Sequence, residues 1–504
     1  MRELTERACL AYWHQLFMGF SVVTKTLGRG TVFNILGGVI PIAASVATIP
    51  FLLTHIGHAR FGVMAIVWTI VGYFGVFDFG LSRTMANQIS KLRSADEELS
   101  VFWTTIWLNF IFGMVGGALL YATTGVIMSH FLKMPDSLQA EALKSLPWIA
   151  ASVPVCTLSG VCVGALDGKQ QFGIANVLQG LGSVLLQVAP MVSAIIIGPE
   201  LSVIIPATVI GRGLSGAFLA VAAIRALKIQ SIRLIEYKQV PVLLGYSSWV
   251  AVTGLVGPIL ETFDRIVLGK LVGAGAVGYY SVPFSIADKL RIFPRAVCRT
   301  LFPVLSTQTR GDAKILAARA TRVIALAMTA AIAPGIQLVG PLLSIWVGAD
   351  FAAVATPIAQ LLLVGVWANG LANVPYTLLQ AQGKPGILAR FQVLELVPFV
   401  ILVYALIHKF GLIGAPLAWA IRAILDSILF FAVAGIGFSN LVRTLPSAIL
   451  IALSLASGLL LKPTIFQSIV IAAAFSVCSA AWLIYTEPVM AKKAFKRVGL
   501  AGGQ

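Results

Sequence analysis

The chain has 504 residues, of which 58% are hydrophobic and only 11% are charged. A soluble globular protein of this length would expose far more charge, so the composition excludes that class and indicates a polytopic membrane protein. The net charge of +17 lies mostly in short loops between apolar runs, where membrane topology explains it without nucleic acid as a partner.

Apolar runs long enough to cross a bilayer, about 20 residues each, follow one another along the chain after an N-terminal lead-in without a signal peptide. We predict an all-α protein with about fourteen transmembrane helices. The expected spans are 33–53, 61–82, 102–128, 146–166, 174–197, 201–225, 242–269, 276–304, 320–346, 355–380, 387–407, 411–436, 445–461 and 465–486.

Lysine and arginine alternate strongly between the two sets of loops. One set, together with both termini, contains most of the positive charge, and we assign it to the cytoplasm. The other set contains only Arg60, Lys133, Lys144, Lys270, Lys409 and Lys462. These outer loops are all short, which excludes an extracytoplasmic enzyme domain.

An internal repeat at an offset of about 216 residues divides the chain. The offset superposes Gly57 on Gly273 and Gly62 on Gly278. We therefore predict two six-helix lobes of the same orientation, with the substrate cavity between them. The expected parts are an N-terminal lead-in (1–30), a first lobe (31–228), a cytoplasmic linker (229–241), a second lobe (242–438), and two further helices with a basic tail (439–504).

Two segments resemble a known family. IGHARFGVMAIVWTIVGYFGVFDFGLSRTMANQIS (56–90) and DRIVLGKLVGAGAVGYYSVPFSIADKL (264–290) are similar to the matching parts of the two lobes of Wzx-type polysaccharide flippases. That family belongs to the multidrug/oligosaccharidyl-lipid/polysaccharide (MOP) exporter superfamily. The resemblance implies a fold like that of the MATE transporters. It also implies transfer of an undecaprenyl-diphosphate-linked oligosaccharide across the bacterial inner membrane, beside a polysaccharide polymerase and chain-length proteins.

The segment 277–300 combines apolar flanks with a charged stripe. At about 100° per residue, Asp288, Arg291, Arg295 and Arg299 fall on one narrow arc of a helix. Each such charge costs roughly 2.5–3.5 kcal/mol at a bilayer centre, so the arc must face protein or water. Two interpretations stay open: arginines that bind a diphosphate in an aqueous cavity, or an ion-pair network that joins two helices.

Other charged residues fall within predicted spans. Glu261 and Asp264 share a face with Arg265. Arg212 has no acid within a turn and needs a distant partner or a ligand, whereas Arg422 has a local partner in Asp426. The substrate-binding candidates are Arg291, Arg295, Arg299, Arg212 and Arg422. The candidates for ion-coupling or structural acids are Asp78, Glu261, Asp264, Asp288 and Glu395, and we expect Asp78 and Glu395 to be lone acids.

Enzyme signatures are missing from the sequence. The 5 cysteines have no zinc or redox spacing, the 5 histidines are scattered, and no phosphate loop begins a soluble helix. We therefore expect a non-enzyme with no cofactor and no metal. The main hypothesis is a lipid-linked oligosaccharide flippase; the alternatives are a drug or cation antiporter of the same superfamily and a membrane-embedded glycosyl polymerase.

Overall fold

The computed structural model describes residues 28–90, 92, 94–126, 128, 134–241, 243, 260–437, 440, 442–461 and 463–486. Within these residues every regular element is a helix, which confirms the predicted all-α class. Nine helical stretches of the described chain are long and apolar enough to cross a membrane, and Leu445–Leu461 is a shorter apolar helix. The count of about fourteen spans therefore stays a prediction.

The described residues form two compact units. Unit 1 takes those within 1–56, 67–130 and 136–255, and unit 2 takes those within 57–66, 131–135 and 256–504. The short segment 57–66 thus belongs to the later unit, although unit 1 lies on both sides of it in the sequence. The predicted lobe boundaries are not tested by this division and stay a prediction.

The first helix, α2 (Gly28–Phe74), is interrupted at Gly57, where φ is 79° and ψ is 163°. It is followed by the 3-10 turn η1 (Gly75–Asp78) and by α3 (Leu81–Ile89). The prediction of one continuous span over 61–82 is wrong. Phe79 and Gly80 have φ values of 47° and 75°, and a left-handed backbone cannot continue a right-handed helix.

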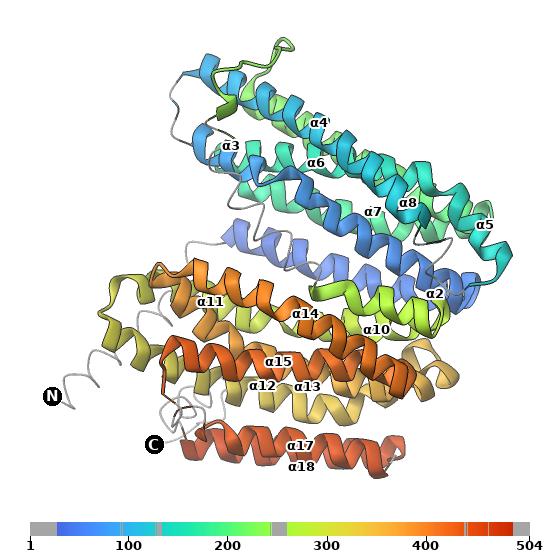
Figure 1. Cartoon of the computed structure of the whole chain (residues 1–504), viewed down its shortest axis with the longest axis vertical. Helices are drawn as coiled ribbons and strands as arrows, with labels where there is room; N and C mark the ends of the chain where they lie inside the picture. Colours follow the sequence, from blue (N-terminus) through green and yellow to red (C-terminus); the bar gives the residue numbers. More distant parts are fainter. Residues whose placement is uncertain are drawn as a thin grey trace. The chain divides into compact units, whose positions relative to one another are not determined.

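Unit 1 is built around one central helix. Its further helices are α4 (Ala95–Val126), α5 (Asp136–Lys144), α6 (Leu146–Gly168), α7 (Phe172–Ile196) and α8 (Leu201–Leu227). Helix α6 packs against α3, α4 and α8, while α7 packs mainly against α8 (Figure 1). The short helix α5 was not predicted, because its mixed composition gives no membrane-spanning signal.

Unit 2 also has a central helix. Its elements are a helical stretch 260–271, α10 (Ala274–Leu290), α11 (Ile292–Thr307), α12 (Arg310–Val347), α13 (Ala349–Ala381), α14 (Pro385–Phe410), the 3-10 turn η3 (Gly411–Ile413), α15 (Gly414–Ala434), α17 (Leu445–Leu461) and α18 (Ile465–Thr486). Helix α13 packs against α10, α11, α12 and α15. Helices α17 and α18 pack against α12.

The two units repeat one packing scheme. In unit 1 the central α6 contacts α4 before it and α8 after it, and α7 contacts α8. In unit 2 the central α13 contacts α12 before it and α15 after it, and α14 contacts α15. The order of helices along the chain is the same in both sets, as the sequence repeat requires.

The predicted span 276–304 is two helices rather than one. Helix α10 ends at Leu290, Arg291 forms a turn, and α11 begins at Ile292. Pro294 has no backbone N–H, so it cannot donate the hydrogen bond that a continuous helix would direct to the carbonyl of Leu290. The break therefore falls within the charged stripe, at Arg291.

Glycines of the repeat meet inside unit 2, where the segment 57–66 packs against the start of α10. A Cβ on Gly62 would lie 1.8 Å from the carbonyl oxygen of Ala274, and a Cβ on Gly278 would lie 2.7 Å from that of His58. Both distances are below van der Waals contact, so this close backbone approach requires glycine at both positions. Gly62 and Gly278 are also equivalent in the repeat.

Candidate functional site

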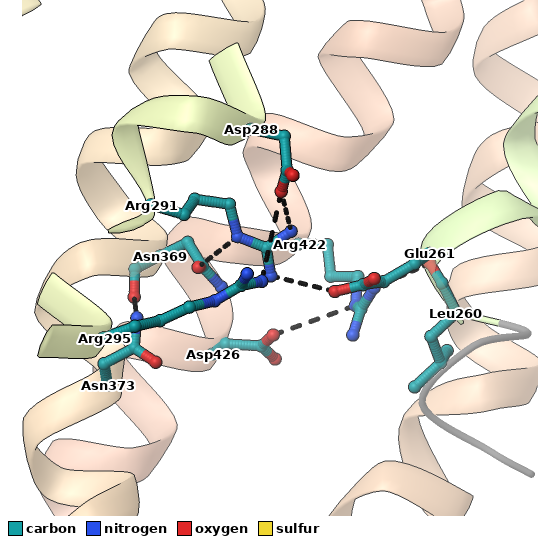
Figure 2. A network of polar contacts seen from close by, with 9 residues as sticks. All are labelled: Leu260, Glu261, Asp288, Arg291, Arg295, Asn369, Asn373, Arg422 and Asp426. Carbon is teal, nitrogen blue, oxygen red and sulfur yellow. Dashed lines mark hydrogen bonds and ion pairs between the residues drawn. The ribbon is translucent and has the colours of Figure 1, made fainter. Parts of the chain in front are cut away.

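A cluster of charged side chains in unit 2 surrounds Arg291 (Figure 2). Its guanidinium donates to Glu261 Oε1 from Nη2 at 2.8 Å and to Asp288 Oδ1 from Nη1 at 3.0 Å. Its Nε donates to Asn369 Oδ1 at 3.2 Å. All three nitrogens are therefore used, and the Arg291 side chain is only 9% exposed. Arg291 joins the 260–271 helix, α10 and α13.

A second guanidinium, that of Arg422 on α15, is held in the same way. Its Nε donates to Glu395 Oε1 on α14, and its Nη1 donates to the carbonyl oxygen of Leu260 at 2.8 Å. Asp426 Oδ2, one turn later on α15, lies 3.8 Å from Nε. The prediction that Glu395 is a lone acid is wrong, and Glu395 is a closer partner of Arg422 than Asp426 is.

Negative and positive charges nearly balance in this cluster. Three guanidinium groups face four carboxyl groups within ion-pair distance among the described residues. They belong to Arg291, Arg295 and Arg422, and to Glu261, Asp288, Glu395 and Asp426. The stripe that looks cationic in the sequence is therefore locally compensated. This arrangement favours the ion-pair network for Arg291 and Arg422.

Arg295 differs from the other two arginines of the cluster. Its side chain is 49% exposed, and its contact with Asp288 Oδ1 is long, at 4.0 Å. A contact of this length between partly exposed groups contributes little. Arg295 keeps most of its five N–H donors available for a ligand.

A cavity of about 160 Å³ lies within the cluster. Its polar walls include the amides of Asn369, Asn373 and Gln392 and the hydroxyl-bearing ring of Tyr376, beside the paired Arg291. A polar cavity of this size has room for several water molecules beside the ion pairs.

The predicted grouping of Glu261 and Asp264 with Arg265 is only partly correct. Glu261 pairs with Arg291, which lies 30 positions further along the chain. Asp264 is fully buried; its two oxygens accept from the backbone N–H of Arg265 and from the hydroxyl of Tyr280. The guanidinium of Arg265 lies 4.3 Å from the ring centroid of Phe284. Asp264 therefore fixes the 260–271 helix against α10.

Two further candidates, Asp78 and Arg212, lie in unit 1. Asp78 Oδ1 accepts from the backbone N–H of Ser82 at 3.1 Å and from its hydroxyl at 2.6 Å. Asp78 therefore satisfies donors at the N-terminus of α3, where a negative charge is favoured. Arg212 lies mid-way along α8 and lines the same cavity as Asp78.

Arg299 lies in α11, but its side chain is outside the described residues. Asn369 and Leu260 were not predicted as site residues from the sequence, although both accept hydrogen bonds from the clustered arginines. An asparagine in an apolar span is a weak signal that could have drawn attention to Asn369. A backbone carbonyl such as that of Leu260 leaves no sequence signal.

Comparisons with known proteins give consistent results. The family described as "Polysaccharide biosynthesis protein" matches residues 27–308. A Shigella flexneri protein named as an O-antigen transporter is 29% identical over 403 residues, which are 80% of this chain and 96% of that protein.

Two solved structures share the fold. The lipid II flippase MurJ in an inward closed conformation has a TM-score of 0.69 and 14% identity, over 90% of this chain and 98% of that chain. An inward-facing multidrug resistance MATE family transporter of the MOP superfamily has a TM-score of 0.64 and 14% identity, over 83% and 98%. These matches confirm the predicted MATE-like fold.

Proposed function

The chain belongs to the polysaccharide biosynthesis protein family, and on this basis we propose that it is a flippase for a lipid-linked oligosaccharide. The proposed cargo is an undecaprenyl-diphosphate-linked oligosaccharide, moved from the inner to the outer leaflet of the bacterial inner membrane. Both termini would lie in the cytoplasm. The pathway served would be export of O-antigen, capsule or exopolysaccharide, beside a polymerase and chain-length proteins.

The observation that best supports this proposal is the relative named as an O-antigen transporter, which matches nearly its full length. The fold adds support, because it is shared with a lipid II flippase. Both indicate transport rather than catalysis. The cycle we propose is alternating access, in which two lobes expose one substrate site to each side of the membrane in turn.

Within this function we propose that Arg295 binds the diphosphate of the cargo. Guanidinium pairs with phosphate oxygens in a two-pronged, charge-assisted contact, and it stays protonated at any relevant pH. Arg295 is half exposed and weakly paired, whereas the donors of Arg291 are used by protein acceptors. Arg291 would then position the start of α11, and Arg422 would join α15 to α14 and to Leu260. Arg299, one turn beyond Arg295, is a further candidate for the same phosphates.

A drug or cation antiporter of the same superfamily is the second candidate function. It is favoured by the four carboxyl groups of the cluster, one more than the three guanidinium groups that compensate them. Such an excess would suit a cationic substrate or a coupling ion. The two candidates differ in cargo, so surface polysaccharide and drug resistance separate them.

The test is complementation of a strain that lacks this gene. The surface polysaccharide and the lipid-linked precursor in the membrane are measured together with the abundance of the protein. We expect the wild-type chain to restore the polysaccharide and the strain without it to accumulate precursor. Unchanged polysaccharide in the deletion strain, with raised sensitivity to cationic drugs, would establish the antiporter instead.

Arginine chemistry is tested in the same strain. Arg295→Ala should weaken cargo binding by about 1.5–3 kcal/mol, the range for a lost charged hydrogen bond, and Arg295→Lys should weaken it less. The control is Lys289→Ala, which removes one exposed positive charge off the stripe and should leave export unchanged. Normal export by Arg295→Ala at normal abundance would refute the assignment of the diphosphate.

A further inference from the structure

Unit 1 contains a cavity of about 440 Å³ that the assignments above leave without a role. It lies where α3, α6, α7 and α8 meet. Its polar wall consists of Asp78, Ser82, Ser159, Asp167, Gln179, Ser183, Arg212 and Ser215. Polar groups at this density inside apolar helices must face water or a polar ligand.

Arg212 is the unusual member of this wall. It lies 11 residues after the start of α8 and 15 residues before its end, so it is close to the middle of a candidate span. Among the described residues, no carboxylate forms an ion pair with it, unlike Arg291 and Arg422 in unit 2. A guanidinium that forms no ion pair at this depth is costly to bury, which favours an acidic group within hydrogen-bond reach on whatever fills the cavity, although Asp78 and Asp167 line the same cavity.

The rest of the wall mainly accepts hydrogen bonds. Ser82 donates its hydroxyl proton to Asp78 Oδ1 at 2.6 Å, Ser159 donates to the Val155 carbonyl at 2.6 Å, and Ser183 donates to the Gln179 carbonyl at 2.9 Å. A hydroxyl that has used its only proton offers lone pairs alone. The carboxyl oxygens of Asp78 and Asp167 also accept.

This pattern defines the ligand by its chemistry. Several acceptors require a partner with several O–H donors, and one guanidinium requires one acidic group. A diphosphate brings no hydroxyl donors, and Asp78 and Asp167 would repel its several charges more strongly than the single charge of a carboxylate. A sugar ring with a carboxylate meets both requirements.

We propose that this cavity is a subsite for an acidic sugar residue, in which Arg212 binds the carboxylate and the serines and aspartates accept from the ring hydroxyls. This proposal rests on the proposed function in one respect only, namely that the sugar belongs to the transported oligosaccharide. The subsite itself predicts binding of a free sugar acid, so it can fail while the flippase assignment stands.

A native cysteine in the cavity wall can be used to measure access to the cavity and its local charge. Cys156 lines the cavity together with Arg212. Thiol-reactive methanethiosulfonates with either a sulfonate or a trimethylammonium group can therefore probe the local charge. Labelling is measured on the purified full-length protein by mass spectrometry of the Cys156 peptide, and Cys156→Ser gives the background from other cysteines.

We expect the anionic reagent to label Cys156 several-fold faster than the cationic one. Arg212→Gln should abolish this preference and Arg212→Lys should keep it. Glucuronate should slow the labelling of the wild type more than glucose or pyrophosphate does, and it should lose this effect in Arg212→Gln. Retained folding is checked for each variant by the elution of a monodisperse peak in gel filtration.

Three outcomes would overturn the proposal. Cys156 that reacts with neither reagent would mean that the cavity is closed to water. Equal protection by glucose and glucuronate, or equal protection of the wild type and Arg212→Gln, would show that the ligand needs no acidic group. Stronger protection by pyrophosphate would assign Arg212 to the diphosphate rather than to a sugar.

Discussion

Replacing Arg291 with methionine should destabilise the protein rather than merely weaken its substrate binding. Methionine keeps the length of the side chain but removes three donors at once. Glu261, Asp288 and Asn369 would each lose a hydrogen bond that Arg291 now donates. The junction between α10 and α11, where the helix is already interrupted, would lose its hydrogen bond to Asn369 of α13.

The size of this effect follows from the exposure of the partners. Breaking a buried ion pair by removing one partner costs about 3–5 kcal/mol, because an unpaired charge stays buried. Glu261 and Asp288 keep 44% and 36% of their side-chain exposure, so water takes over part of the lost interaction. We therefore expect the free energy of unfolding to fall by roughly 2–3 kcal/mol, below the range for fully buried pairs.

Thermal unfolding of the purified protein in detergent and its abundance in the membrane measure this loss. Glu261→Gln in the Arg291→Met background should restore part of the stability, since only the Asp288 carboxylate then lacks its arginine partner. A double-mutant cycle over these two positions gives the coupling between them. If Arg291→Met unfolds at the wild-type temperature and is equally abundant, yet exports no polysaccharide, the structural role is refuted and Arg291 is a substrate ligand.

Three further predictions follow from single contacts. Asp78→Ala removes the acceptor at the start of α3 and should lower stability by about 0.5–2 kcal/mol, measured by thermal unfolding; no change would show that water replaces the cap. Gly62→Ala places a Cβ 1.8 Å from a backbone oxygen and should lower the membrane abundance sharply, whereas Gly275→Ala, which has nothing within 4 Å, should not; equal abundance of the two would contradict the close crossing. Cysteine introduced at Ser202 should react with an impermeant reagent added outside intact cells and cysteine at Gly311 should not, and the opposite result would invert the predicted topology.

Local patterns in the sequence were enough to predict most of the long helices and their order, but not α5 or the breaks within 61–82 and 276–304. A hydrophobic run of about 20 residues must be helical in a membrane, because its backbone has no other hydrogen-bonding partners there. The break at Arg291 was harder to predict, although Pro294 contains the reason for it. Prolines are common in such helices, and the sequence does not say which of them interrupts its helix.

Partners of the charged residues could not be predicted in the same way. Periodicity placed Arg291 and Arg295 on one arc. It did not show that Arg291 donates hydrogen bonds to three protein acceptors while the side chain of Arg295 is half exposed. The difference depends on Glu261 and Asn369, which lie 30 and 78 positions away in the chain. Contacts at this range depend on helix packing, so only the structure distinguishes a scaffold arginine from an available one.

The packing of residues 57–66 against α10 has a consequence for biogenesis. Gly62 is synthesised 212 residues before its contact residue Ala274 (274 minus 62). At about 5–20 residues per second, translation leaves roughly 10–40 s during which this bare glycine backbone has no native neighbour in the bilayer. The helices of unit 1 can fold during that interval. Residues 57–66 cannot make their native contacts until α10 is synthesised. Until then the nascent chain depends on lipid or an insertion factor to cover this segment.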